Sequence, residues 1–188
     1  MQVIPSIDIL NRVLENEVDI GVGLAIQPDN RINRIPFYTE TYSLFVTKEH
    51  KLADKHIIIP ADLVNMPLVM YPKGFSGRDL IETWCSSQEI AIDTLMETGS
   101  ATSLFQLVKA GIGATIQPSQ LIESFQSLGI RAIPIEDSPT RNLEMFYRTD
   151  KYLSQSSRAF LKQMETFFEI TNLQHLLFSR YIMDNTRI

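Results

Sequence analysis

The sequence of 188 residues contains a single cysteine, Cys85, and no apolar run long enough to cross a bilayer. One cysteine excludes an internal disulfide framework and fits a reducing compartment. The N-terminus has neither the basic segment nor the apolar stretch of an export signal. These absences predict a cytoplasmic protein without a membrane partner.

Positive charge is also scarce. The chain has 17 basic and 22 acidic residues and a net charge of −5. A chain with this balance is not expected to wrap nucleic acid by itself. Hydrophobic residues make up 44% of the sequence and charged residues 21%, as in an ordinary globular protein. The length suits one large domain or two small lobes.

Patterns for cofactors and metals are missing too. Gly21-Val22-Gly23 and Gly111-Ile112-Gly113 lack the third glycine of a dinucleotide fingerprint. The three histidines, His50, His56 and His175, do not have the spacing of a zinc site, and we interpret them as solvated surface groups. We therefore expect neither a cofactor nor a metal.

Single reactive residues are better explained by structure than by catalysis. Cys85 follows Trp84 in a predicted helix, where a cysteine is typically a small packing residue. Asp19 lies in an apolar strand, and we expect its carboxylate to bond to backbone amides. The sequence thus predicts that the chain is not an enzyme.

The most informative stretch is the segment 97–118. Thr98, Gly99 and Ser100 precede apolar residues at the i, i+3, i+4 and i+7 positions of one helical face, namely Ala101, Leu104, Phe105 and Val108. Gly111 stands where a helix ends in the left-handed conformation, and residues 114–116 resemble a buried strand. Unpaired N–H groups and hydroxyls in the first turn would suit a carboxylate or similar anion. Serine and threonine at a helix start are more often plain caps of their own backbone, and both interpretations stay open here.

Helices and strands alternate along the rest of the chain. Helical patterns are expected at residues 6–14, 62–63, 80–84, 119–128, 154–168 and 172–188, and strand patterns at 18–24, 36–46, 67–71, 90–96, 130–135 and 142–148. This alternation predicts an α/β architecture with ligand contacts at the carboxyl ends of strands. In the loop after the strand at 67–71, Lys73 and Arg78 are either anion ligands or solvated cations.

Several short segments occur in a characteristic order and spacing: Glu15–Val22, Tyr42–Val46 with His50-Lys51-Leu52, Ala61–Leu63 with Pro67, Gly74–Arg78, and Leu107–Pro118. Together they resemble the effector-binding domain of LysR-type transcriptional regulators over roughly residues 3–170. Lys51 stands where that family usually has proline, and Gln117 where it usually has an apolar residue.

The resemblance implies two Rossmann-like lobes of the type-2 periplasmic-binding-protein kind, joined by two crossover strands. Lobe one would be residues 1–46 and 136–188, lobe two residues 47–135, and the crossovers residues 42–46 and 133–148. A small, anionic effector would lie between the lobes. Its expected contacts, mapped from strand-to-helix junctions, are Ala25, Gln27, Tyr71, Lys73, Gly74, Thr98, Gly99 and Ser100.

The resemblance also implies partners. A winged helix-turn-helix would precede the domain, and neither it nor the family's first strand is found in this sequence, so we expect contact with DNA only through that N-terminal module. Homodimers or homotetramers are expected, with the apolar tail at 173–178 as an additional contact. Two alternatives share the scaffold: a solute-binding protein, which needs an export signal, and an enzyme, which needs a convergent acid or base in the cleft.

Overall fold

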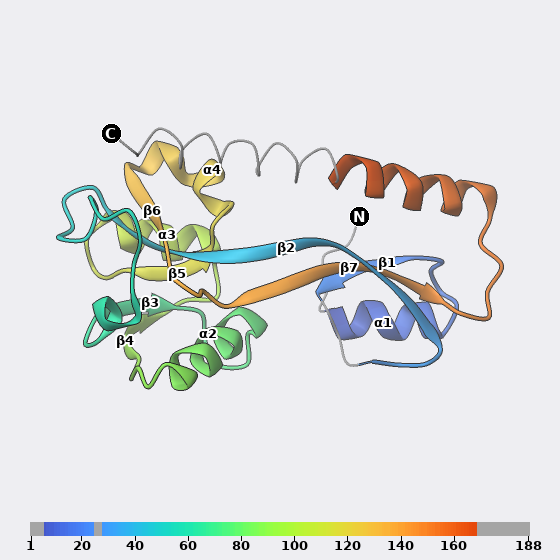
Figure 1. Cartoon of the computed structure of the whole chain (residues 1–188), viewed down its shortest axis with the longest axis horizontal. Helices are drawn as coiled ribbons and strands as arrows, with labels where there is room; N and C mark the ends of the chain where they lie inside the picture. Colours follow the sequence, from blue (N-terminus) through green and yellow to red (C-terminus); the bar gives the residue numbers. More distant parts are fainter. Residues whose placement is uncertain (1–5, 25–27, 169–188) are drawn as a thin grey trace. The chain divides into compact units, whose positions relative to one another are not determined.

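The computed structural model describes residues 6–24 and 28–168 (Figure 1). The chain forms two compact units, residues 1–39 with 141–188 and residues 40–140. The lobe limits suggested by the resemblance, 46/47 and 135/136, differ slightly from these and stay a prediction. In the part of the chain that the structure describes, no helix is long and apolar enough to span a membrane.

The first unit is a small sheet covered on both faces. Its elements are α1 (Ser6–Leu14), β1 (Gly21–Leu24), the first half of β2 (Ile32–Thr47), β7 (Thr140–Arg148) and a helix at residues 155–168. β1 pairs with β7 in antiparallel register, Gly21 opposite Phe146. Consecutive strand residues point to opposite faces, so Phe146 packs with α1 while Met145 packs with Leu161 of the later helix.

The second unit contains strands of two sheets, which an isolated bridge connects into one layer. The second half of β2 pairs antiparallel with β5 and β6, β3 pairs parallel with β4, and a parallel bridge between Leu68 and Ala114 connects β3 to the start of β5. The elements added here are the 3-10 turns Pro60–Leu63 and Gln126–Leu128, the strands β3 (Pro67–Met70), β4 (Asp93–Glu97), β5 (Thr115–Pro118) and β6 (Ile130–Pro134), and the helices α2 (Ser76–Ser87), α3 (Ala101–Lys109) and α4 (Leu121–Phe125).

Two apolar clusters hold this sheet between helices. Leu44 packs in one cluster with Ile81 and Trp84 of α2, and its neighbour Phe45 packs in the other with Leu104 and Phe105 of α3. The alternation of strand side chains therefore places α2 and α3 on opposite faces. This three-layer arrangement confirms the predicted α/β class.

Several element boundaries need correction. The expected crossover strand at 133–148 is two strands, β6 and β7, because Asp137 adopts a left-handed φ of 46° and Pro139 follows it. The strand expected at 18–24 begins only at Gly21, and the strand expected at 90–96 begins at Asp93. The predicted tail helix at 172–188 lies outside the described residues.

Two side-chain predictions in the first unit are also wrong. The carboxylate of Asp19 bonds to side chains rather than to backbone amides: Lys151 Nζ lies 2.7 Å from it and Ser157 Oγ donates at 2.9 Å. These hydrogen bonds lower the pKa of Asp19. The helical spacing from Ser154 onward also predicts that Phe160, Leu161 and Phe167 share an apolar face. Leu161 is buried, but Phe160 and Phe167 are exposed, so the buried face is narrower than predicted.

Candidate functional site

Helix α3 begins where β3 and β4 end. The N–H of Thr98 donates to the carbonyl of Met70 at 3.0 Å, which keeps the chain leaving β4 beside the end of β3. Ser100 is the N-cap of α3, with an extended backbone, and its Oγ accepts from the N–H of Ser103 at 3.4 Å. The sequence pattern thus located the helix start correctly, and the capping interpretation describes a real contact.

Capping leaves donors available at the same helix start. In the described part of the chain, the N–H groups of Ala101 and Thr102 have no hydrogen-bond acceptor. Gly99 and Ser100 are exposed and Thr98 is half-buried. The first turn therefore combines open backbone donors, the positive end of the helix dipole and two hydroxyls, which together can hold an anionic group.

An aromatic pair lies next to this polar turn. The rings of Tyr71 and Phe75 stack with centroids 5.4 Å apart and planes 5° apart. Phe75 Cζ would lie 3.8 Å from a Cβ added at Gly99, and Phe75 is 45% exposed. Sequence reasoning missed Phe75, because the helical and strand patterns around it gave no reason to select one residue of a loop.

Arg78 does not belong to an open anion site. It is 3% exposed, and its guanidinium contacts Glu82 Oε1 at 2.7 Å and Glu97 Oε1 at 3.2 Å. It also donates to the carbonyl of Tyr71 and to Thr94 Oγ1, each at 3.0 Å. Arg78 therefore ties the ends of β3 and β4 to α2, and its charge is balanced by carboxylates.

The other residues predicted to contact the effector are not gathered at the start of α3. Lys73 is an exposed residue of the loop between β3 and α2, and Gly74 in the same loop adopts a positive φ of 88°. Ala25 and Gln27 lie outside the described residues. The structure thus brings Tyr71, Thr98, Gly99 and Ser100 together at one edge of the second unit, with Phe75 added to them.

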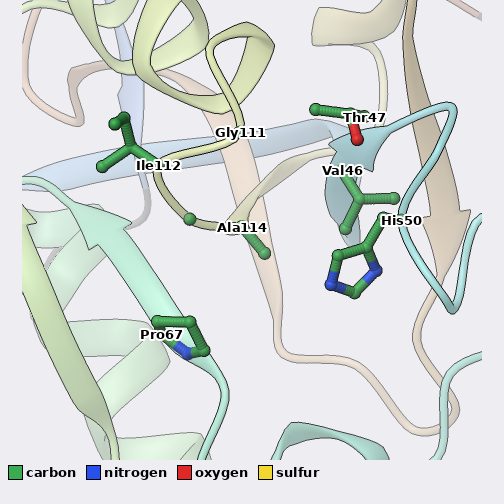
Figure 2. Close-up of a pocket in the computed structure, with 8 residues that line it drawn as sticks. Val46, Thr47, His50, Pro67, Gly111, Ile112 and Ala114 are labelled. Carbon is green, nitrogen blue, oxygen red and sulfur yellow. The ribbon is translucent and has the colours of Figure 1, made fainter.

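A separate pocket of about 120 Å³ lies in the second unit (Figure 2). It is lined by Val46, Thr47, His50, Pro67, Gly111, Ile112, Gly113 and Ala114. His50 is half-buried, and its Nδ1 accepts from the N–H of Leu52 at 3.2 Å. Burial, and secondarily the charge of Lys51, lower the pKa of His50. The interpretation of His50 as a solvated surface group was therefore wrong.

Reactive chemistry is not favoured at the other groups considered. Cys85 is buried, and burial together with Glu82 raises the pKa of its thiol to about 11, which fits a packing role. Among residues 6–24 and 28–168, no cluster of three or more histidine, cysteine or acidic side chains could hold a metal ion.

Comparison with known proteins gives a consistent picture. The profile of the LysR substrate binding domain matches residues 1–169. The uncharacterised HTH-type transcriptional regulator YwbI of Bacillus subtilis is 24% identical over 163 residues, which cover 86% of this chain and 54% of YwbI. The chain thus spans about half the length of such relatives.

Two solved structures are similar in fold. The CcmR regulatory domain of Synechocystis PCC6803, in complex with 2-PG, superposes with a TM-score of 0.74 at 20% identity, covering 87% of this chain and 80% of that one. The effector binding domain of QuiR, in complex with shikimate, gives a TM-score of 0.73 at 17% identity, covering 88% and 78%. These likenesses confirm the predicted periplasmic-binding-protein-like fold.

Proposed function

Because the chain belongs to the LysR substrate-binding domain family, we propose that it senses an anionic small-molecule effector on behalf of a bacterial transcription regulator. The effector is a small metabolite with a carboxylate or a similar singly charged group. The family is a ligand-binding domain of regulators, so the chain is not an enzyme, as the sequence predicted.

The observation that carries the anionic character is the open first turn of α3. Ala101 and Thr102 present N–H groups without an acceptor in the described part of the chain, and the hydroxyl of Ser100 is exposed beside them. A carboxylate can accept from all three groups, and charge-assisted hydrogen bonds are roughly twice as strong as neutral ones. The nearby Arg78 is already paired with carboxylates. The proposed effector seat, residues 98–102, therefore offers N–H dipoles rather than excess positive charge.

The exposed ring of Phe75 indicates that the effector has an apolar portion. Its ring is 45% exposed, is backed by the stacked ring of Tyr71 and lies next to Gly99. A flat apolar surface beside a set of N–H donors suits a molecule with a hydrophobic or ring-shaped body and a carboxylate at one end. Lys73, on the same loop, is an exposed cation that would add long-range attraction.

The wider role follows from the relatives. YwbI is an HTH-type regulator of which this chain spans about half, so we assign DNA contact to a helix-turn-helix module in front of the domain. With a net charge of −5 the domain itself has no electrostatic footprint for DNA. We further propose that the regulator acts in the cytoplasm as a homodimer or homotetramer.

Titration calorimetry with a panel of small carboxylates and their amides tests the proposed seat. At least one carboxylate should bind, and its amide should bind more weakly. Ser100→Ala should weaken that binding about tenfold, and Gly99→Val should weaken it further, because a side chain there blocks the approach to the backbone. Ser86→Ala, an exposed serine in α2, is the matched control and should leave the affinity unchanged. Unchanged affinity in folded Ser100→Ala and Gly99→Val proteins would reduce these residues to helix caps.

A further inference from the structure

The pocket beside His50 lies at the opposite end of the same elements that form the proposed effector seat. Pro67 begins β3, whereas Tyr71 follows its end, and residues 111–114 follow α3, whereas Ser100 precedes it. Val46 and Thr47, at the end of β2, complete the wall. The pocket is contained in the unit of residues 40–140 and shares no lining residue with the effector seat.

Backbone hydrogen bonds fix the walls of the pocket relative to each other. The N–H of Ala114 donates to the carbonyl of Pro67 at 3.0 Å, and the N–H of Val69 donates to the carbonyl of Ala114 at 2.7 Å. These bonds fix the loop after α3 against the start of β3. Gly113 fits this arrangement because a Cβ there would lie 2.8 Å from the carbonyl oxygen of Pro67. The space is therefore preformed and is not closed by side chains of the loop.

The surface of the pocket is mainly aliphatic. Val46 and Ala114 are buried, and Pro67 and Ile112 complete an apolar lining. The exposed fraction of Ile112 is 41%, which places this side chain at the open side. A volume of about 120 Å³ approaches that of cavities, about 150 Å³, that take up benzene. Molecules of about six non-hydrogen atoms therefore fit.

His50 gives this pocket a directed donor. Its Nδ1 already accepts from the N–H of Leu52, so the proton of the neutral ring is on Nε2. Within the described residues Nε2 makes no hydrogen bond, and Figure 2 shows the ring turned toward the side where Pro67 and Ala114 lie. The hydroxyl of Thr47 is a second polar group on the same wall.

We propose that this pocket is a second ligand site, which takes a small uncharged molecule with a short aliphatic body and one hydrogen-bond acceptor, such as a ketone or an amide. The acceptor receives the Nε2 proton of His50, and the body contacts Val46, Pro67 and Ile112. An anion is disfavoured, because burial lowers the pKa of His50 and no lysine or arginine lines the pocket.

The competing explanation is that His50 only stabilises the turn after β2 through its bond to Leu52. His50→Asn separates the two roles, because the side-chain oxygen of asparagine can replace Nδ1 as the acceptor while its amide N–H groups do not reach as far as Nε2. Ile112→Trp is a second variant that fills the open side without touching the turn.

The test is an NMR titration of the chain with cyclopentanone, following backbone amides and the His50 ring nitrogens. We expect saturable shifts at Gly111, Ile112 and Gly113, with a Kd in the millimolar range that suits so small a ligand. His50→Asn should weaken binding roughly fivefold, the worth of one neutral hydrogen bond, and Ile112→Trp should abolish the shifts.

Three outcomes would overturn the proposal: no saturable shift in the unmodified chain, equal affinity in folded His50→Asn, or equal occupation of the pocket by cyclopentanecarboxylate. If His50→Asn fails to fold, the cyclopentanone titration of Ile112→Trp alone decides whether the pocket is the binding site. Retained cyclopentanone shifts in that variant would contradict the site, and their loss would support it.

Discussion

The two ends of helix α3 differ in almost every physical property. At its start, the N–H groups of Ala101 and Thr102 have no acceptor within the described residues, and Gly99 is exposed. At its end, the N–H groups of Gly111 and Ile112 donate to the carbonyls of Val108 and Leu107 at 2.9 and 3.1 Å. The start of the helix therefore offers unpaired N–H groups. At the other end these N–H groups bond to carbonyls of the last helical turn, and that end borders an aliphatic pocket.

This difference suits the two proposed sites, at the two ends of one short helix, to two kinds of ligand. The dipole and open donors at the start favour an anion, whereas the turn after Lys109, at the negative end of the dipole, does not. His50, in the segment after β2, adds a directed donor near the second end. The predictions below test this contrast, from the largest expected effect to the smallest.

Replacement of Arg78 should have the largest effect. Arg78→Ala removes a guanidinium that bonds to the carbonyl of Tyr71 and to Glu97, Glu82 and Thr94. We expect the free energy of unfolding to fall by about 3 kcal/mol, measured by urea denaturation. Lys73→Ala, on the same loop but exposed, should change it by less than about 0.5 kcal/mol. Similar losses in both variants would contradict the structural role given to Arg78.

The glycines at the two ends give a matched pair. A Cβ at Gly113 would lie 2.8 Å from the carbonyl oxygen of Pro67 and 3.3 Å from Val69 Cγ2, whereas a Cβ at Gly99 would meet only Phe75 Cζ at 3.8 Å. Gly113→Ala should therefore destabilise by about 1–3 kcal/mol, and Gly99→Ala by less than about 0.5 kcal/mol. Thermal unfolding of the two variants compares them. An equal loss of stability in Gly113→Ala and Gly99→Ala would mean that the two ends of α3 are equally tightly packed.

Loss of the helix cap should have a moderate effect. The Oγ of Ser100 accepts from Ser103 at a long 3.4 Å, so Ser100→Ala should lower the free energy of unfolding by only about 0.5–1 kcal/mol. The loss of carboxylate-binding free energy in Ser100→Ala, measured separately by calorimetry, should exceed this loss of stability. A stability loss without any loss of affinity would restrict Ser100 to capping.

The smallest effect expected is a dependence of stability on pH at the His50 end. Because burial and Lys51 lower the pKa of His50 from its ordinary 6.5, the unfolded chain binds a proton at a higher pH than the folded chain. The contribution is neutral above 6.5 and destabilises progressively as the pH falls through 6.5 toward the lower folded pKa. Denaturation midpoints measured between pH 8 and pH 5 should fall less steeply for His50→Asn than for the unmodified chain. Parallel curves would contradict this.

Local signals in the sequence predicted both ends of α3 well. Ser100 caps the helix and Gly111 ends it with a φ of 72°, and both roles depend on residues within one turn. The apolar face of Leu104, Phe105 and Val108 is buried as its spacing predicted. The strand patterns at 130–135 and 142–148 also separated β6 from β7, whereas the single crossover strand at 133–148 implied by the resemblance passed over the left-handed Asp137.

Contacts distant in sequence account for what was missed. Arg78 resembles a loop cation until β4 supplies Thr94 and Glu97. Phe75 gains its position from Tyr71 and Gly99, and His50 lines a pocket only because β3 and the loop after α3 meet there. None of these pairings follows from periodicity, so the partners of individual side chains required the structure.

The most direct test compares two probes of the same ring size on one spectrum. Backbone amide shifts are recorded while the chain is titrated with cyclopentanecarboxylate and, separately, with cyclopentanone. The carboxylate should shift the amides of residues 98–103, and cyclopentanone those of residues 111–114, with neither probe shifting the other set at comparable concentration. If both probes shift the same residues, or the carboxylate leaves 98–103 unchanged, the assignment of an anion seat to the start of α3 is contradicted.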